Sequence, residues 1–290
     1  MAGTLYVVAT PIGHLEDITY RAVRILGEVD LIACEDTRQT RKLLTRYQIA
    51  TPTISYHEHN ERQRARYLIE QLEAGRSVAL VSDAGTPTIA DPGLTLIQQA
   101  IAHNIRVVPI PGPSALITAL MAAGISAEPF LFIGFLPARQ SARRNQLEAL
   151  RSWPYTLICY EAPHRIRAAL KDMLLVWGDR QVVLARELTK LHEEFHRGHL
   201  SELAEQFHQR SIKGEIVLVV AGATTAEAPS QRPTTHVQSS IYQRVMELMQ
   251  ANALSLNAAI KQVSQERRLS KKSVYHAYIQ QRPQERNDGG

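Results

Sequence analysis

Short apolar runs alternate with longer amphipathic segments along the first part of the chain. The segment Leu94–His103 places its apolar residues three and four positions apart, which is the spacing of one buried helix face. Strands that alternate with helices form a mainly parallel sheet covered on both faces. We therefore predict an α/β fold with strands at Leu5–Ala9, Leu31–Cys34, Thr53–Tyr56, Val78–Val81 and Val107–Ile110.

A second series of alternating elements begins after Gly124. Its predicted strands are Phe130–Gly134, Thr156–Tyr160, Val182–Arg186 and Ile216–Ala221. Its predicted helices are Arg143–Leu150, Pro163–Trp177 and His199–Gln209. A chain of 290 residues is long for one core and suits two domains with a small third element. We predict one α/β domain at residues 1–123 and a second at residues 124–222.

The alternation of predicted strands and helices ends after Gly222. The stretch GATTAEAPSQRP at residues 222–233 has no apolar periodicity and is typical of a linker, which we place at residues 223–235. Beyond it, a helical element is predicted at residues 236–290, with helices at Ile241–Gln250, Leu256–Arg267 and Ser270–Gln281.

Charge distinguishes this last part from the rest. The final sixty residues hold nine Lys and Arg against four Asp and Glu, which accounts for the whole net charge of +5. A local basic element is typical of a protein that binds a polyanion, and a solvated helical face is the alternative.

Several classes of protein are disfavoured by the sequence. No stretch approaches eighteen apolar residues, and the N-terminus has neither a basic segment nor an apolar signal core, so we expect a cytoplasmic protein without a membrane span. Cys34 and Cys159 stand alone and predict buried, reduced thiols. The histidines lack HExxH spacing, so no metal site is expected.

Three turns rich in small residues follow predicted strands of the first domain, at Thr10–Gly13, Ser82–Gly85 and Pro111–Ser114. Ligands of open α/β sheets bind beyond the carboxyl ends of the strands, where such turns meet. Small residues leave backbone N–H and C=O groups free for a ligand, and Asp83 adds an acceptor for a hydroxyl or amino group. Turns that need Gly and Pro only for their dihedral angles are the alternative.

The pattern of glycines indicates which ligand to expect. Neither the GxGxxG fingerprint nor a GxxxxGK[ST] phosphate loop is present, which disfavours dinucleotides and nucleoside triphosphates. A ligand with hydroxyl groups and an adenine, but without phosphates, suits backbone-rich loops better.

Several long motifs are specific enough to indicate a family. They are TPIG (10–13), EDIT (16–19), CEDTRQTRKLL (34–44), SDAGTPTIADPG (82–93), PGPSALITAL (111–120), YEAPHR (160–165) and RELTKLHEE (186–194). In this order and spacing they resemble the tetrapyrrole methylase superfamily, and within it the ribosomal small-subunit RNA methyltransferase I family, over roughly residues 4–222.

The resemblance implies an S-adenosylmethionine-dependent homodimer of the class III methyltransferase type, with the cofactor between two α/β domains. The implied substrate is cytidine 1402 in the decoding region of 16S ribosomal RNA, within the 30S subunit, methylated on its ribose 2′-oxygen. By the same resemblance, the cofactor residues are Pro11, Asp83, Ala84, Gly85, Thr86, Ser114, Ala115, Tyr160, Glu161 and Ala162. His14 stands where the family leads us to expect Asn.

Transfer of an activated methyl group requires little beyond alignment and exclusion of water. A neutral ribose hydroxyl is a poor nucleophile, so a general base or a cation that stabilises a developing alkoxide would help. Polar residues directly after predicted strands are the candidates. Besides the three residues that we favour below, this set contains Glu58, Glu161 and His164. We favour Glu187 with Lys190 as the pair that faces the ribose, and His57 as a base or phosphate contact. Surface ion pairs or helix caps are the alternative for each.

Basic residues in two segments are candidate RNA contacts. In the C-terminal element they lie near tyrosines that could stack on bases. A capping subdomain with tyrosines in its core is the alternative. The candidates are Arg38, Arg41, Lys42, Lys261, Arg267, Arg268, Lys271, Lys272 and Tyr275, with Arg46, His276 and Tyr278 nearby.

Two other functions stay open. Another enzyme of the superfamily would methylate a tetrapyrrole or a protein, and the basic C-terminal element argues against it. A non-catalytic RNA-binding or ribosome-assembly factor would have no reason to keep a cofactor cleft.

Overall fold

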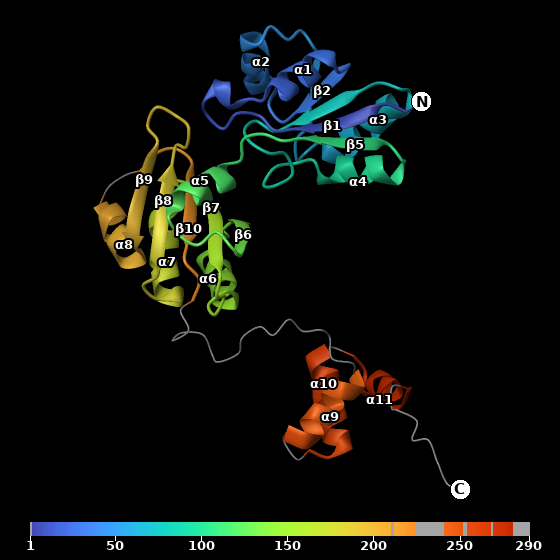
Figure 1. Cartoon of the computed structure of the whole chain (residues 1–290), viewed down its shortest axis with the longest axis vertical. Coiled ribbons are helices and arrows are strands. Elements are labelled where there is room, and N and C mark those ends of the chain that lie inside the picture. Colours follow the sequence, from blue (N-terminus) through green and yellow to red (C-terminus); the bar gives the residue numbers. More distant parts are fainter. Residues whose placement is uncertain (1, 210–211, 224–240, 252–253, 268, 281–290) are drawn as a thin grey trace. The chain divides into compact units, whose positions relative to one another are not determined.

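The computed structural model describes residues 2–209, 212–223, 241–251, 254–267 and 269–280 (Figure 1). The chain divides into two compact units, Met1–Pro229 and Ser230–Gly290. The boundaries predicted within the first unit, at residues 123 and 124, stay a prediction.

The first sheet is entirely parallel, as predicted, with strand order β3-β2-β4-β1-β5. Its central strand β4 is buried along its whole length, which is why it reads as a continuous apolar run. The strands are β1 (Thr4–Val8), β2 (Leu31–Cys34), β3 (Thr53–Ser55), β4 (Val78–Val81) and β5 (Arg106–Ile110).

Helices cover both faces of this sheet (Figure 1). In β4, Val78 and Leu80 pack with α3 and α4, whereas Ala79 and Val81 pack on the other face with α1 and α2. The alternation follows from the two-residue period of a strand. The helices are α1 (Tyr20–Glu28), α2 (Thr37–Arg46), α3 (Glu61–Glu73) and α4 (Leu94–Ala102), and a 3-10 helix, η1 (Leu15–Asp17), precedes α1.

The second sheet is mixed rather than parallel, with strand order β6-β7-β10-β8-β9. Only β6 and β7 are parallel, whereas β10 runs antiparallel to both β7 and β8. The edge strand β9 was not predicted, because its sequence EFHRGH is polar and shows no apolar alternation. The strands are β6 (Phe130–Phe135), β7 (Thr156–Glu161), β8 (Gln181–Arg186), β9 (Glu194–His199) and β10 (Ile216–Val220).

One face of the second sheet packs against α6 (Gln140–Ala149), α7 (Ile166–Trp177) and α8 (Leu200–Gln209). The other face packs against α5 (Ala115–Ala123), whose Ala119 and Leu120 meet Val183 and Val219. Thus α5 follows a strand of the first sheet in sequence but completes the core of the second.

The C-terminal unit contains α9 (Ile241–Ala251), α10 (Leu256–Arg267) and α11 (Lys271–Gln280), in agreement with the predicted helices. Its core includes Val245, Val263 and Val274, and the rings of Tyr242 and Tyr278 stack with centroids 5.3 Å apart. The linker predicted at residues 223–235 lies, beyond Ala223, outside the described residues. Within the described part of the chain, no helix is long and apolar enough to span a membrane.

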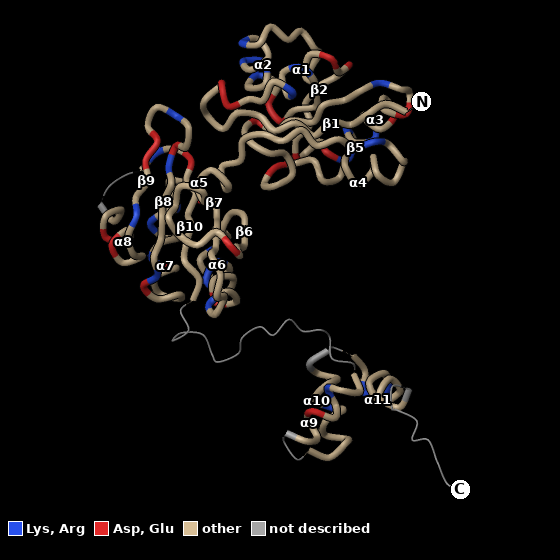
Figure 2. The backbone as a smooth tube through the Cα atoms, in the orientation of Figure 1, with Lys and Arg blue, Asp and Glu red and all other residues tan. Residues whose placement is uncertain are grey.

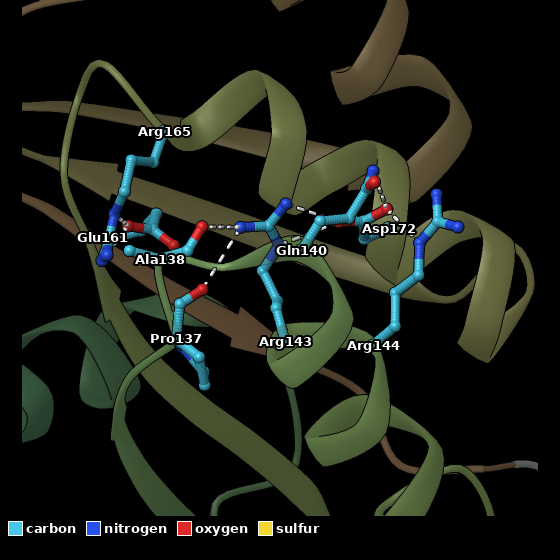
Figure 3. Close-up of polar contacts among 8 residues, drawn as sticks. All are labelled: Pro137, Ala138, Gln140, Arg143, Arg144, Glu161, Arg165 and Asp172. Carbon is cyan, nitrogen blue, oxygen red and sulfur yellow. Dashed lines mark hydrogen bonds and ion pairs between the residues drawn. The ribbon is translucent and has the colours of Figure 1, made fainter.

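A buried ionic cluster ties α6, α7 and the segment after β6 together (Figure 3). Asp172 accepts hydrogen bonds from Arg143 Nη2 at 2.6 Å and Arg144 Nε at 2.7 Å, and Arg143 also donates to the carbonyls of Pro137 and Ala138 at 3.2 Å. Asp172 and Arg143 are almost fully buried. Burial alone raises the pKa of Asp172, but hydrogen bonds from Arg144 and Arg143 outweigh it and hold the pKa below its ordinary value.

The substitution Asp172→Asn should lower the free energy of unfolding by about 3–5 kcal/mol, because Arg143 stays buried without its counter-ion. Urea unfolding at pH 7 measures this change. Because the folded-state pKa of Asp172 is depressed, its contribution is present at neutral pH and is lost only as the pH falls through that pKa. The control Glu148→Gln removes an exposed pair with Arg151 and should cost less than about 1 kcal/mol. A loss in the Asp172 variant no larger than in the control would contradict the assignment.

Candidate functional site

A cavity of about 400 Å³ lies where loops from the two sheets meet. This volume suits a ligand of the size of a small cofactor. The first sheet contributes the segments that follow β1, β4 and β5, and the second contributes the ends of β6 and β7, the segment after β8 and the start of β10. The lining residues are Ile12, Asp83–Thr86, Ile89–Asp91, Ser114, Ala115, Phe135, Tyr160–Pro163, Leu188 and Glu215–Val217.

Backbone hydrogen bonds join the three small-residue turns of the first sheet. Thr10 N donates to Gly85 O at 2.8 Å, and Gly85 N donates back to Thr10 O at 3.0 Å. Gly85 has a φ of +81°, and a Cβ there would lie 3.2 Å from Ile12 Cγ2. Thr86 Oγ1 donates to the Pro113 carbonyl at 3.1 Å, which brings in the third turn. The turns therefore converge as predicted, and the positive φ together with the close approach of Ile12 favours glycine at position 85.

The turn after β1 also contacts the second sheet. His14 N donates to Thr189 Oγ1 at 3.0 Å, and a Cβ at Gly13 would lie 2.5 Å from Lys190 Cγ. The His14 ring accepts a hydrogen bond from Glu16 N at 3.3 Å and so caps η1. Histidine at this position therefore supplies the capping acceptor that the expected asparagine would supply.

The predicted cofactor residues all line the cavity except Pro11, whose neighbour Ile12 lines it instead. Glu161 is the most deeply buried polar residue of this group. Its Oε1 accepts hydrogen bonds from Arg165 Nε at 2.6 Å and from Ala162 N at 2.7 Å. Its Oε2 is buried and has no hydrogen-bond partner among the described residues. An unpartnered buried carboxylate oxygen is costly, so this wall of the cavity is suited to a ligand with a hydrogen-bond donor.

Several lining residues were not predicted. Asp91 belongs to the motif SDAGTPTIADPG but was not selected, and Phe135 ends β6. Glu215 and Ile216 were missed for a topological reason. In a parallel sheet, ligand-binding residues follow the strands. The antiparallel β10 instead brings its first residues to the edge where β7 and β8 end, with Ile216 paired to Glu161 and Arg186.

The predicted pair Glu187 and Lys190 forms an ion pair of 3.0 Å beside the cavity. Lys190 Nζ also binds Glu215 Oε2 at 3.1 Å, and Glu215 lines the cavity together with Leu188. Burial by itself lowers the pKa of Lys190, but the hydrogen bonds to Glu187 and Glu215 outweigh it and raise the pKa. Burial likewise raises the pKa of Glu187, and the hydrogen bonds from Lys190 and the Glu215 backbone reverse this effect. Lys190 therefore stays a cation and Glu187 an anion at neutral pH.

His57 is not among the residues that line the cavity. Its Nε2 lies 3.0 Å from Asn60 Nδ2, and its backbone N–H donates to Asn60 Oδ1 at 2.9 Å. Its Nδ1 is buried and has no hydrogen-bond partner within the described part of the chain. The structure thus brings Glu187 and Lys190 to the cavity edge but does not bring His57 there.

The predicted RNA contacts of α2 lie on its exposed face, and Figure 2 shows basic residues along this helix. The helix begins next to the cavity, because Asp36 N donates to Asp83 Oδ1 at 2.9 Å. The residues concerned are Arg38, Arg41, Lys42 and Arg46.

In the C-terminal unit, Lys261, Lys271, Lys272 and Tyr275 are exposed. Tyr278 belongs to the core of that unit, so the suggestion that it stacks on RNA bases was wrong. The side chain of Arg267 and the whole of Arg268 lie outside the described residues.

Comparisons with known proteins agree with this arrangement. The profile of the tetrapyrrole (corrin/porphyrin) methylases matches residues 4–204. The chain is 47% identical to ribosomal RNA small subunit methyltransferase I of Halalkalibacterium halodurans over 96% of each chain. It is 44% identical to the protein of that name from Bacillus subtilis, over 95% of this chain and 94% of the other. Uroporphyrin-III C-methyltransferase from Thermus thermophilus, solved with S-adenosyl homocysteine, superposes with a TM-score of 0.55 at 18% identity, covering 76% of this chain and 97% of its own, and shares the fold.

The close approach at Gly13 gives a stability prediction. The substitution Gly13→Ala should lower the free energy of unfolding by about 1–3 kcal/mol, because the new methyl group overlaps Lys190 and Thr189. Thermal or urea unfolding measures the change. Gly27→Ala is a matched control in α1, where nothing lies within 4 Å of the added Cβ, and it should be neutral or slightly stabilising. Equal effects of the two substitutions would contradict the close contact.

Proposed function

The chain belongs to the tetrapyrrole methylase family and, within it, to the ribosomal RNA small subunit methyltransferase I family, and on this basis we propose that it methylates cytidine 1402 of 16S ribosomal RNA on the ribose 2′-oxygen. The methyl donor is S-adenosylmethionine. The observation that carries the proposal is identity of 44–47% to curated relatives of that name over nearly the full length of both chains. The homodimer, the 30S subunit as substrate and the cytoplasmic location are proposed with it.

The cavity suits S-adenosylmethionine in three respects. Its volume is appropriate, its first-sheet wall consists of backbone and small side chains, and two carboxylates are available for donors of the ligand. Asp83 and the unpartnered Oε2 of Glu161 would accept hydrogen bonds from hydroxyl or amino groups. The cavity as a whole is poorly suited to phosphates, because the ionisable groups of its described lining residues are acids and one phenol.

The cofactor, when bound, supplies a methyl group that its sulfonium already activates. The chain then has to hold the ribose hydroxyl in line, exclude water and stabilise charge on the oxygen as its proton is lost. Lys190 is suited to the last of these tasks, because it stays charged and lies beside Glu215 on the cavity edge. Glu187 holds Lys190 in place, and its low pKa makes it a weak base. We therefore propose Lys190 as the catalytic cation and Glu187 as its positioning partner.

The RNA would be bound by two basic surfaces. Helix α2 begins next to the cavity, where Asp36 contacts Asp83. Its exposed basic residues can therefore direct the phosphate backbone of the RNA toward the cavity. Of the two roles expected of His57, that of a base at the ribose does not fit its place outside the cavity, and that of a phosphate contact stays a prediction. The C-terminal unit adds exposed lysines and Tyr275, which combine phosphate neutralisation with a ring for stacking.

Methyl transfer from labelled S-adenosylmethionine to 30S subunits that lack the modification tests the proposal. Nuclease digestion and mass spectrometry should locate a single 2′-O-methyl group on cytidine 1402, and already modified subunits should accept none. Label on another nucleotide, on a ribosomal protein or only on an added tetrapyrrole would contradict the proposed substrate. Absence of any transfer, with cofactor binding intact, would favour a non-catalytic assembly factor.

The substitution Lys190→Ala should lower the single-turnover rate constant of methyl transfer about 10²-fold while the affinity for S-adenosylmethionine changes little, because the cation acts on the developing alkoxide. Single-turnover transfer to 30S subunits and calorimetric titration measure the two quantities. Lys171→Ala, at an exposed position of α7, is the matched control and should behave as the unmodified protein. Near-normal turnover of the Lys190 variant would exclude the catalytic role.

Deletion of residues 233–290 should weaken binding to 30S subunits at least about tenfold and leave cofactor affinity unchanged, since these residues form a separate compact unit with most of the net positive charge. Filter binding over a range of salt concentrations is the measurement. In the full chain, simultaneous replacement of Lys261, Lys271 and Lys272 by Ala should reproduce part of the loss and reduce the salt dependence. Loss of cofactor binding together with RNA binding would indicate a structural role for the unit.

A further inference from the structure

The acids of the cavity wall are not matched by bases of that wall. Asp83, Asp91, Glu161 and Glu215 line the cavity, whereas no Lys, Arg or His is found among its described lining residues. A small cavity with low-dielectric walls concentrates the field of such charges. The wall therefore favours a ligand that brings positive charge.

Two of the four acids form ion pairs with basic residues that do not line the cavity. Glu161 pairs with Arg165 at 2.6 Å, and Glu215 pairs with Lys190 at 3.1 Å. Asp83 accepts only a backbone hydrogen bond, from Asp36 N, and Asp91 forms no ion pair within the described part of the chain. Asp83 and Asp91 are therefore the two lining acids without a cationic partner among the described residues, and Lys190, the partner of Glu215, is shared with Glu187.

Asp91 is the more confined of these two carboxylates, since it is half-buried and Asp83 is exposed. Burial raises the pKa of Asp91, the charges of Asp83 and Glu215 raise it further, and a hydrogen bond from Ser82 opposes them. The pKa of the neighbouring Glu35 is raised by burial and then by Asp83, Asp91 and Asp36. These acids repel one another, and a cation in the cavity would relieve the repulsion.

We infer that Asp91 makes the cavity selective for charge, so that it holds the cationic methyl donor more tightly than the neutral product that methyl transfer leaves behind. The inference rests on the proposed function, because it takes S-adenosylmethionine as the ligand. During transfer the methyl carbon bonds to the ribose oxygen, the hydroxyl proton passes to solvent, and the electron pair of the broken carbon–sulfur bond stays on sulfur. The sulfonium charge is thereby lost, while the amino-acid and adenosine parts are unchanged.

Loss of the sulfonium charge would favour release of the product. A unit charge a few ångströms from a partly buried carboxylate changes a binding constant by about tenfold or more at the effective dielectric constant of protein sites. S-adenosylhomocysteine loses this attraction but keeps its other contacts. Asp91 would thus act as a specificity determinant that limits product inhibition.

Calorimetric titration of the full chain with S-adenosylmethionine and with S-adenosylhomocysteine, at pH 7.5 and without RNA, tests the inference. The unmodified protein should bind the methyl donor about 3- to 30-fold more tightly than the product. Asp91→Asn should bring the two Kd values within about twofold of each other, mainly by lowering the affinity for the methyl donor. Glu28→Gln removes one exposed negative charge of α1, outside the cavity, and should leave the ratio unchanged.

The decisive quantity is the Kd for S-adenosylhomocysteine divided by the Kd for S-adenosylmethionine. A ratio of one or below in the unmodified protein, or a ratio unaffected by Asp91→Asn, would overturn the inference. An equal loss of affinity for both ligands in the Asp91→Asn variant would overturn it too, because Asp91 would then contact a part that the two ligands share. If the variant fails to fold by circular dichroism, the unmodified protein still gives the answer. Its preference should shrink as the pH is lowered from 7.5 through the pKa of Asp91, which burial raises above its ordinary value. Glu35, Asp83 and Glu215 are the other acids near Asp91. A preference that stays constant over this range would exclude the inference. Failure of the unmodified protein to bind either ligand would instead contradict the proposed function.

Discussion

The site depends on the close approach of backbone segments at the carboxyl ends of neighbouring strands. The reciprocal hydrogen bonds between Thr10 and Gly85 hold the turn after β1 against the turn after β4, and the left-handed conformation of Gly85 makes this pairing possible. A side chain at position 85 would meet both an unfavourable φ and Ile12. With the Thr86 hydroxyl hydrogen-bonded to the Pro113 carbonyl, the three turns form one continuous wall of backbone and small residues. Pre-organisation of this kind lowers the entropic cost of holding a cofactor.

The opposite wall is built by a different route. In the second sheet, β10 runs antiparallel to its neighbours, so that Glu215 begins a strand at the edge where Glu161 ends one. The segment after β8 folds over this edge with positive φ at Glu187 and Thr189, and it contacts Gly13 of the first wall. Strained backbone of this kind persists where surrounding contacts fix it, and it is common at functional sites. The ionic pairs of Lys190 lie at this junction, which places a fixed cation beside an acidic cavity.

The sequence was informative where local physics determines structure and less so where pairing is long-range. The parallel order of the first sheet follows from the alternation of apolar runs and amphipathic segments, and the long motifs indicated the family, as the comparisons confirm. Strand β9 could not be predicted, because the polar sequence EFHRGH at a sheet edge has no apolar period. Strand β10 was found, but its direction was not, and this concealed Glu215. The burial of Tyr278 depends on its partner Tyr242, thirty-six residues away in sequence, which no local pattern reveals.

We propose that one methyl donor occupies the cavity between the two walls, in contact with both. A crystal structure of the protein with S-adenosylhomocysteine would show this contact. Ligand density should be bounded by Gly85 and Ser114 on one side and by Tyr160 and Ile216 on the other, with a ligand donor within hydrogen-bond distance of Glu161 Oε2. Ligand bound outside this cavity, or in contact with only one of the two walls, would contradict it.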